Sequence, residues 1–555
     1  MKKNIFIILF LFIIGLVLRI IYAGAPLWYD EACSWATAVQ SFPSGIMRNL
    51  LNTDLQHTPL YFFLLHYWMK IFGASEFAMR FLSLIFGVLT VPLTFILANK
   101  ITSKSNAFFA GLVCCVCPLL VLFSSEVRMY SAVVFLVLLS LNYLTDFEQK
   151  NDKKSLIKLV ITNILIPYTF VGGILYNLSL IICYSHYLIK NNKEKLHKYL
   201  KYEKIEWLCL IPYFILIFYY AKMRSLFVIS HEGALRFAYI IDVIRNFFGA
   251  TIENNVYWVN DTFTLTFGFC LLVIVPCVYF IWGYIKTLKD DNGFIKFLSI
   301  LVFANFAFAI LFSALKVNVF TCRYILYVLP MAIILSVIGL REKLSQKHFK
   351  IFLILFILCS GVFSIKNAKT INTNKETAFK ISAIECAKLG LNSNDVVIMP
   401  FGSDAPYYFR DLTAPVAPNF DFHKIARNPY GVYYDNNQQK VMKSNKKYDL
   451  IYKKIGENDV FSNKFYKYFK TNVTNNVSKG RYAVLIMYGT DNNAIINIDD
   501  LRKQIKDIQY VKSNTLDVLF KKYMCDIAAM LNADFNFVNA YQSGNFTYYI
   551  YQKKN

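Results

Sequence analysis

Long apolar runs decide what this chain can fold into. The hydrocarbon core of a bilayer is about 30 Å thick, and a helix crosses it with roughly 20 apolar residues. Eleven stretches reach that length, helped by tilt or by flanking residues where they are short. With 56% hydrophobic and only 17% charged residues among 555, the chain is too apolar for a water-soluble protein. We therefore predict an α-helical polytopic membrane protein with about eleven spans. The stretches lie near residues 4–22, 79–99, 106–123, 129–145, 157–170, 172–189, 206–220, 263–285, 295–315, 323–340 and 350–366.

The first of these runs has some features of a signal peptide. Residues 4–22 follow Lys2 and Lys3, and the small residues 23–25 after them resemble a cleavage site. The apolar core of a signal peptide is about 7–15 residues long, however, and this run is longer and is followed by many further spans. We expect it to be retained as the first helix.

Loop charge sets the predicted orientation. The formal charge of +24 comes from lysine-rich tracts between apolar runs, which is typical of cytoplasmic loops and does not call for a nucleic-acid partner. The apolar segment 58–72 carries His66 and Lys70 and decides the topology. If it lies on the membrane surface, all these tracts face the cytoplasm; if it spans, all face outside. The positive-inside bias favours a surface helix.

This topology places a defined set of segments outside an integral, multi-pass plasma membrane protein, which we expect to be bacterial. The external segments are 23–78, 124–128, 221–262, 316–322 and 367–555. In 221–262 an apolar helical face predicts an amphipathic helix on the membrane.

The carboxyl-terminal region differs from the rest of the chain. It is polar, and it combines strand-like runs at 396–399, 482–487 and 546–551 with helical patterns near 376–389 and 498–509. A region of this size can bury its own core. We predict two domains: a membrane domain at 1–366, whose external loop 23–78 contains surface helices, and an extracytoplasmic α/β domain at 367–555.

Ionisable residues gather at the predicted external face. Arginines at span ends often only anchor a helix at the interface, but anchoring does not explain paired carboxylates beside them. Arginine is also disfavoured in external loops, so three arginines at the external ends of predicted spans are noteworthy. The residues are Asp30-Glu31, His57 before the surface helix, Arg80, Glu126-Val127-Arg128 with Met129-Tyr130, and Arg323-Tyr324.

At these residues the sequence resembles the membrane glycosyltransferases of the GT-C fold, especially the branch of the protein O-mannosyltransferases and lipid A aminoarabinose transferases. The resemblance covers roughly residues 1–145 and returns at 323–330. It departs from the family at Thr58, where a second proline is common. The matching pieces are Trp28-Tyr29-Asp30-Glu31, the His-x-Pro-Leu-Tyr stretch 57–61, the segment 72–80 ending in Arg80, Ser125-Glu126-Val127-Arg128-Met129-Tyr130, and Arg323-Tyr324 followed by Pro330.

The resemblance implies roles for these residues. Asp30 is expected to be the base that activates the acceptor, with Glu31 beside it. The donor phosphate is expected near His57 and the positively charged span mouths, with Tyr61 and Glu126 in support. The residues assigned to the phosphate are His57, Arg80, Arg128, Arg323 and Tyr324.

The chemistry of the reaction supports this division on its own. A lipid phosphate leaving the anomeric carbon of a sugar is a weakly basic anion, so it needs positive charge more than a general acid. The acceptor hydroxyl needs a proton acceptor, which a carboxylate provides. A glycosidase would instead want two opposed carboxylates. We predict an inverting transferase that uses a polyprenyl-phosphate sugar, with a lipid, glycan or protein as acceptor and membrane lipids around it.

Several alternatives stay open at this stage. Asp30 can cap the following helix, His57 can cap a turn, and Glu126 can form a structural ion pair with Arg128. No cofactor is required, although a divalent metal held by Asp30, Glu31 and His57 is conceivable. The rival function is a polytopic transporter or lipid flippase, which would place ionisable residues near the bilayer midplane.

Overall fold

The chain forms two compact units in the computed structural model. The first unit comprises residues 1–25, 37–226 and 230–372, and the second comprises 26–36, 227–229 and 373–555. The helices expected within 226–262 and at 498–509 lie outside the residues that the structure describes. Those residues are 2–21, 23–24, 26–53, 57–225, 267–314, 320–343, 345–375, 379–398, 469–488, 527–543 and 546–555.

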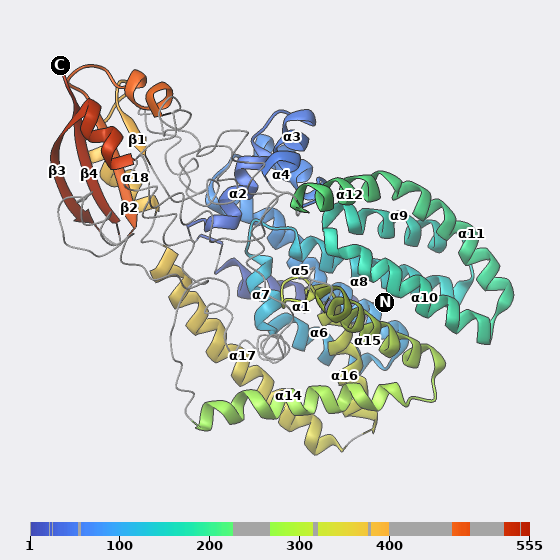
Figure 1. The fold of residues 1–555 in the computed structure, drawn as a ribbon. Helices are drawn as coiled ribbons and strands as arrows, with labels where there is room; N and C mark the ends of the chain where they lie inside the picture. The colour runs from blue at the N-terminus through green and yellow to red at the C-terminus, as the bar shows by residue number, and fades with distance from the viewer. Residues whose placement is uncertain are drawn as a thin grey trace. The chain divides into compact units, whose positions relative to one another are not determined.

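The first unit is built from helices (Figure 1). Every apolar run predicted from the sequence overlaps at least one of them, because a continuous apolar segment satisfies its backbone hydrogen bonds internally as a helix. The helices are α1 Lys2–Ile20, α3 Ser44–Thr53, α4 Leu60–Phe72, α5 Glu76–Ile101, α6 Lys104–Val116, α7 Pro118–Ser124, α8 Tyr130–Lys150, α9 Lys153–Thr169, α10 Ile174–Asn191, α11 Lys193–Cys209, α12 Ile211–Ser225, α14 Phe267–Leu288, α15 Gly293–Ala314, α16 Leu329–Lys343 and α17 Gln346–Lys375, with short 3-10 turns at Val171–Gly173 and Leu326–Val328.

Length and composition identify the strongest membrane spans. Among the described residues, four helices are long and apolar enough to cross a bilayer, or five if α6 and α7, bent by 58°, count as one. The four are Glu76–Ile101, Tyr130–Lys150, Val171–Asn191 and Gly293–Ser313. These apolar helices are those of an integral membrane protein. The count of eleven spans stays a prediction.

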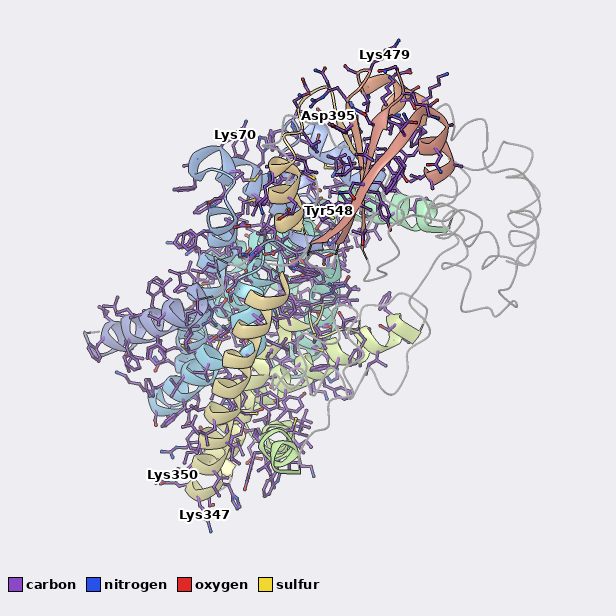
Figure 2. All side chains as sticks on the ribbon, turned by 90° about the vertical axis from the view of Figure 1, so that its left-hand side faces the viewer. Lys70, Lys347, Lys350, Asp395, Lys479 and Tyr548 are labelled. Atoms are coloured by element: carbon purple, nitrogen blue, oxygen red, sulfur yellow. The ribbon has the colours of Figure 1, made fainter. Side chains whose placement is uncertain are left out.

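The segment that decides the topology forms a separate short helix. α4 has 13 residues, which rise about 20 Å and fall short of a bilayer core of about 30 Å. Gly73 ends it with a φ of +80°, and Ser75 then caps α5 by accepting from the Ala78 N–H at 3.2 Å. Figure 2 shows Lys70 of α4 at the opposite end of the first unit from Lys347 and Lys350 of α17. This arrangement agrees with a surface helix, while the orientation in the membrane stays a prediction.

One lysine-rich segment, expected as a loop, is helical. α11 covers the tract at 193–204, and its buried face consists of Lys195, Tyr199, Glu203 and Glu206. These buried residues are spaced as on one face of a helix, but most of them are polar. The sequence therefore shows no apolar periodicity that would predict this helix. The Glu206 carboxylate accepts from the Asn163 amide of α9 at 3.0 Å and the Asn177 amide of α10 at 2.9 Å.

Two glycines let α14 and α16 cross closely. A Cβ added to Gly339 would lie 1.8 Å from the Gly283 carbonyl oxygen, and one added to Gly283 would lie 2.4 Å from the Ser336 carbonyl oxygen. The Ser336 hydroxyl donates to the Phe280 carbonyl at 3.0 Å. Small residues at helix crossings are the usual means by which membrane helices gain close backbone packing.

The second unit contains a small mixed sheet. Its strands are β1 Val396–Ile398, β2 Tyr482–Tyr488, β3 Phe535–Ser543 and β4 Phe546–Lys553, in the order β1-β2-β4-β3. β1 and β2 are parallel and the other pairs are antiparallel. Helix α18, Phe379–Lys388, precedes β1, and α2, Tyr29–Ala38, begins in this unit. The three strands expected from the sequence are confirmed, whereas the complete α/β domain stays a prediction.

A buried carboxylate joins the first two strands of this sheet. Asp395, labelled in Figure 2, is 0% exposed and accepts from the backbone N–H groups of Asn392 and Tyr482, each at 2.8 Å. It also forms an ion pair with the Arg481 guanidinium. Because Asp395 directly precedes β1 and Arg481 directly precedes β2, these bonds fix the start of the parallel pair.

Candidate active site

The first unit contains a buried pair of bonded side chains, His57 and Arg128. His57 comes just before α4, and Arg128 lies in the turn between α7 and α8. The Arg128 Nη2 is 2.6 Å from the His57 Nε2, and the two residues are 4% and 6% exposed. A guanidinium can only donate, so the imidazole accepts through Nε2 and carries its proton on Nδ1. His57 therefore orients the guanidinium of Arg128.

The backbone of Arg128 is held by two serines. The Ser83 hydroxyl of α5 donates to the Arg128 carbonyl at 3.0 Å, and the Ser131 hydroxyl of α8 donates to the Ser83 carbonyl at 2.8 Å. The Tyr61 hydroxyl of α4 lies 2.7 Å from the Ser83 hydroxyl. Since the Ser83 proton is already directed at a carbonyl, Tyr61 must donate. Tyr61 thus helps to fix the start of α5 against the start of α8, while its supporting role in a site stays a prediction.

Aromatic rings connect Arg128 with the second arginine motif. The Arg128 Cζ lies 6.0 Å from the centroid of the Tyr130 ring, which is 6.4 Å from the Tyr324 ring. The Arg323 Cζ lies 5.1 Å from the Tyr324 centroid. Phe170 packs against both tyrosines, at 6.2 and 5.6 Å. Motifs nearly 200 residues apart in the sequence are therefore brought to one place, and two arginines stand at the ends of one aromatic row.

Arg80 lies one helical turn before Ser83 on α5. It is 1% exposed, and its Nη1 donates to the Ala23 carbonyl at 3.3 Å. A buried arginine of this kind is not an anchor at the bilayer surface, because an anchoring arginine would extend its charged group into water. The structure places Arg80 on the same helix end that contacts Arg128, so it belongs to the same face of the unit.

Glu126 is buried beside this network at 7% exposure. Its backbone carbonyl accepts from the Arg128 N–H at 2.7 Å, which forms the tight turn between α7 and α8. This turn is a local consequence of the Glu-Val-Arg sequence and directs Arg128 toward His57. The ion pair between the Glu126 and Arg128 side chains stays a prediction.

Asp30 and Glu31 belong to the second unit, at the start of α2. The Trp28 carbonyl accepts from the Ala32 N–H at 3.0 Å, and the Trp28 N–H donates to the Glu31 Oε2 at 3.1 Å. This is the backward contact of a capping box, made by the third helical residue. Glu31, 0% exposed, therefore caps the helix through this contact. Asp30 is only half-buried, and its carbonyl accepts from the Ser34 hydroxyl at 3.1 Å.

The proposed metal site receives no support from a cluster of ligands. Among the described residues, no group of three or more His, Cys, Asp or Glu side chains could hold a metal ion. Whether the protein requires a divalent metal stays open.

Sequence reasoning missed three kinds of residue in this network. Ser83 and Ser131 had no signal beyond their spacing from the arginines. Tyr220 of α12 donates to the His57 carbonyl at 2.8 Å and comes from a segment read only as a span. Arg19 is 0% exposed within α1, and the signal available for it was an arginine inside an apolar run.

Comparison with known proteins now bears on this arrangement. The family model described as dolichyl-phosphate-mannose-protein mannosyltransferase matches residues 56–220. That range contains His57, Tyr61, Arg80, Glu126 and Arg128. No curated protein matched the sequence.

Two solved structures cover nearly the whole chain. The apo structure of ArnT from Cupriavidus metallidurans aligns over 98% of this chain and 97% of its own, at 12% identity and a TM-score of 0.55. The structure of the same protein bound to undecaprenyl phosphate aligns over the same shares, at 11% identity and a TM-score of 0.57. The chain has the GT-C fold. The resemblance noted from the motifs is confirmed, and the GT-C comparison supports an enzyme of glycosyl transfer without identifying its sugar.

Proposed function

We propose that this GT-C protein is an inverting glycosyltransferase, which moves a sugar from a polyprenyl-phosphate-linked donor to a lipid, cell-wall glycan or protein acceptor at the extracytoplasmic membrane face. The observation that carries the proposal is the buried Arg128 guanidinium, held by the imidazole of His57 within the segment matched by the mannosyltransferase family. Undecaprenyl phosphate bound to ArnT, a protein of the same fold, supports a donor of this chemical class.

The proposed donor phosphate is bound by arginine. As the bond between the anomeric carbon and the phosphate oxygen breaks, negative charge grows on the departing phosphate. Guanidinium groups stabilise that charge through short, charge-assisted hydrogen bonds. Arg128 is oriented for this by His57, and Arg80, Arg323 and Tyr324 are proposed to contribute from the same helix ends. His57 acts on the donor through Arg128 in this scheme.

The acceptor is activated by Asp30 in the proposed mechanism. Its carboxylate takes the proton of the acceptor hydroxyl while the oxygen forms a bond to the anomeric carbon from the side opposite the phosphate. One proton moves to Asp30, one glycosidic bond forms, and the polyprenyl phosphate leaves with the electron pair of the broken bond. The assignment rests on the Asp-Glu motif and on the need for one base. Glu31 lies beside Asp30, and its Oε2 accepts from the Trp28 N–H at the start of α2.

A reconstituted transfer assay tests the proposal. The purified protein in lipid nanodiscs is incubated with polyprenyl-phosphate sugars and with envelope lipids, glycans or peptides as acceptors. Cells lacking the protein should accumulate one lipid-linked sugar and lose one glycoconjugate. If the purified protein moved the donor across a liposome membrane and formed no product, the transporter alternative would replace this proposal.

Within that assay, Asp30→Asn should abolish transfer. The substitution keeps the size of the side chain but removes its ability to take a proton, and loss of a general base costs roughly 10²–10⁴-fold in rate. Donor affinity should change little. Glu31→Gln is the matched control: it should lower thermal stability through the weakened cap more than it lowers turnover. Near-normal turnover in Asp30→Asn would remove Asp30 from the mechanism.

A further inference from the structure

Arg19 is a fully buried arginine near the end of the first helix. Among the described residues, its guanidinium donates to neutral acceptors: the Ser124 hydroxyl and the Cys115 carbonyl, each at 3.1 Å, the Gly15 carbonyl at 3.2 Å and the Cys114 carbonyl at 3.5 Å. A buried charge is costly unless hydrogen bonds satisfy it. An arginine in an apolar helix of this kind therefore has a specific task.

Its acceptors mark the break between α6 and α7. In a continuous helix the Cys114 carbonyl would accept from the amide of residue 118, but that residue is proline and has no N–H. The two helices are bent by 58° at this point. Arg19 thus supplies donors to carbonyls near the end of α6 that the break leaves without their helical partner.

Arg19 also bonds to residues at the carboxyl-terminal end of α7. The Arg19 Nε donates to the Ser124 hydroxyl, and the Ser125 hydroxyl donates to the Arg19 carbonyl at 3.0 Å. On the other side of Ser124, Gly87 of α5 leaves room for it, since a Cβ there would lie 2.0 Å from the Ser124 Oγ. Arg19 and Gly87 together fix the residues that immediately precede Glu126, Val127 and Arg128.

We propose that Arg19 is a positioning residue for Arg128, and through it for the phosphate of the lipid-linked donor. This inference rests on the proposed function. Arg19 bonds to Ser124 and Ser125, on the amino-terminal side of the turn between α7 and α8. Ser83 bonds to the Arg128 carbonyl, on the carboxyl-terminal side of the same turn. With both ends fixed, the guanidinium of Arg128 reaches the His57 imidazole in one position.

Steady-state kinetics of the full-length protein in nanodiscs test the inference. Arg19→Met should raise the KM for the donor on the order of tenfold, because charge-assisted bonds to a displaced guanidinium weaken, and should change kcat less. Arg19→Lys should recover part of this, since an ammonium can reach one or two of the acceptors. Combined with Arg128→Ala, Arg19→Met should add little further loss, because residues that act through one another are not additive.

A second measurement separates positioning from general stability. Hydrogen exchange at the backbone amides of 124–129 should speed up in Arg19→Met and, to a smaller extent, in Ser125→Ala. The serine variant removes the bond from the Ser125 hydroxyl to the Arg19 carbonyl and a longer one, of 3.4 Å, to the Val121 carbonyl. Ser140→Ala is the matched control: Ser140 is also fully buried and bonds to Asn163 and Tyr176, away from the turn. It should lower the melting temperature and leave both the donor KM and the exchange at 124–129 unchanged.

The outcomes separate this inference from the proposed function. Unchanged exchange at 124–129 and an unchanged donor KM in folded Arg19→Met would overturn the role of Arg19. If that variant did not fold, the same result in both Arg19→Lys and Ser125→Ala would overturn it. An equal rise of KM in Ser140→Ala would overturn it too, by assigning the effect to stability. Absence of any transfer by the wild-type protein would overturn the proposed function, and the exchange data would still report whether Arg19 fixes the turn.

Discussion

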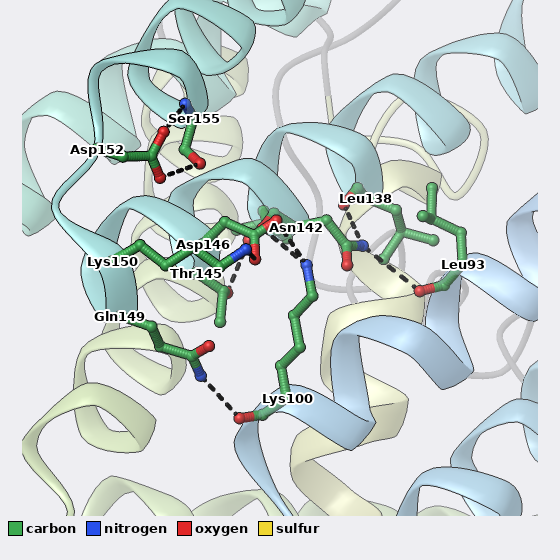
Figure 3. Close-up of polar contacts among 11 residues, drawn as sticks. Leu93, Lys100, Leu138, Asn142, Thr145, Asp146, Gln149, Lys150, Asp152 and Ser155 are labelled. Carbon is green, nitrogen blue, oxygen red and sulfur yellow. Dashed lines mark hydrogen bonds and ion pairs between the residues drawn. The ribbon is translucent and has the colours of Figure 1, made fainter. Parts of the chain in front are cut away.

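Helices α5 and α8 begin together and end together, and their two ends are built differently. At their start, the Arg128 guanidinium bonds to an imidazole, and the Ser83 hydroxyl bonds to the Arg128 carbonyl. At their far end, shown in Figure 3, Lys100 bonds to the Asp146 carboxylate at 2.9 Å, and Lys150 bonds to the same carboxylate at 3.1 Å. The lysine side chains are 22% and 62% exposed, whereas Arg128 is 4% exposed.

The contacts at the far end are ion pairs between lysines and a carboxylate, whereas the start of the helices holds a bond between a guanidinium and an imidazole. A carboxylate neutralises its lysine, and pairs of this kind near water contribute about 0–1 kcal/mol to stability. An imidazole lone pair fixes the direction of a guanidinium but leaves its positive charge intact. The far end is therefore organised as an ordinary helix surface, and the start of the helices is where we propose that the donor phosphate binds.

The first prediction is all-or-none and concerns the sides of the membrane. Lys70 in α4 and Lys347 in α17 are exposed residues at opposite ends of the first unit (Figure 2). In a cysteine-free background, a membrane-impermeant maleimide added to intact cells should label Lys70→Cys and spare Lys347→Cys. In permeabilised cells the maleimide should label both cysteine variants. Labelling of both sites, or of neither, before permeabilisation would refute the predicted topology and with it the external position of the site.

The second prediction compares the two ends by activity. Arg128→Ala should lower kcat/KM for the donor roughly 10- to 150-fold, since a charge-assisted bond of about 1.5–3 kcal/mol is lost. Lys100→Met, which removes a paired cation at the far end, should leave the donor kinetics unchanged and shift the melting temperature slightly. Similar losses of activity in the two variants would show that the contrast between the ends has no functional meaning.

The sequence was sufficient for the elements that apolar runs define. The helices overlapping 79–99 and 129–145, and the strands at 482–487 and 546–551, could be predicted because an apolar segment of given length has few ways to satisfy its backbone. α11 could not, because its buried face holds Glu203 and Glu206, and the Glu206 carboxylate is satisfied by amides from α9 and α10. Periodicity detects apolar faces, and a polar face satisfied by other helices leaves no such signal.

The candidate site was predictable in part for a related reason. Arg128 and Tyr324 belong to motifs that can be recognised locally, and their approach through Tyr130 follows from the fold. The role of His57 toward Arg128 depends on a bond across 71 residues and could not be read from spacing. Arg19 was overlooked for a different reason: a single charged residue within a long apolar run is easily taken as part of a membrane span.

The third prediction tests whether His57 contacts the donor or orients Arg128. His57→Ala should lower kcat/KM for the donor roughly 5- to 30-fold, because a buried guanidinium loses an acceptor at a cost of about 1–2 kcal/mol. His57→Gln should recover much of this, since its amide oxygen can accept from the Arg128 Nη2 but carries no charge for a phosphate. Equal losses in the alanine and glutamine variants would return His57 to direct contact with the donor.

The smallest expected effect lies at the far end, where Asp152 caps α9. Its carboxylate accepts from the Ser155 N–H at 2.7 Å and from the Ser155 hydroxyl at 2.8 Å (Figure 3). The bond from the Ser155 N–H, followed by that from its hydroxyl, holds the pKa of Asp152 below the ordinary value for aspartate. A carboxyl whose pKa is lowered by folding adds stability above its unfolded pKa of about 4 and loses it as the pH falls through the folded value.

Asp152→Asn should therefore separate cap geometry from charge. The amide oxygen can still accept from the Ser155 N–H, so the variant should melt only slightly below the wild type at pH 7. As the pH falls through the lowered pKa of Asp152, the wild-type carboxyl takes up its proton and the two melting temperatures should converge. Donor kinetics at pH 7 should be identical, because this cap lies at the end of the unit opposite the proposed phosphate site. A melting difference that persisted unchanged as the pH fell below the folded pKa of Asp152 would show that its negative charge contributes nothing. A change in donor KM would mean that the two ends of the unit are coupled.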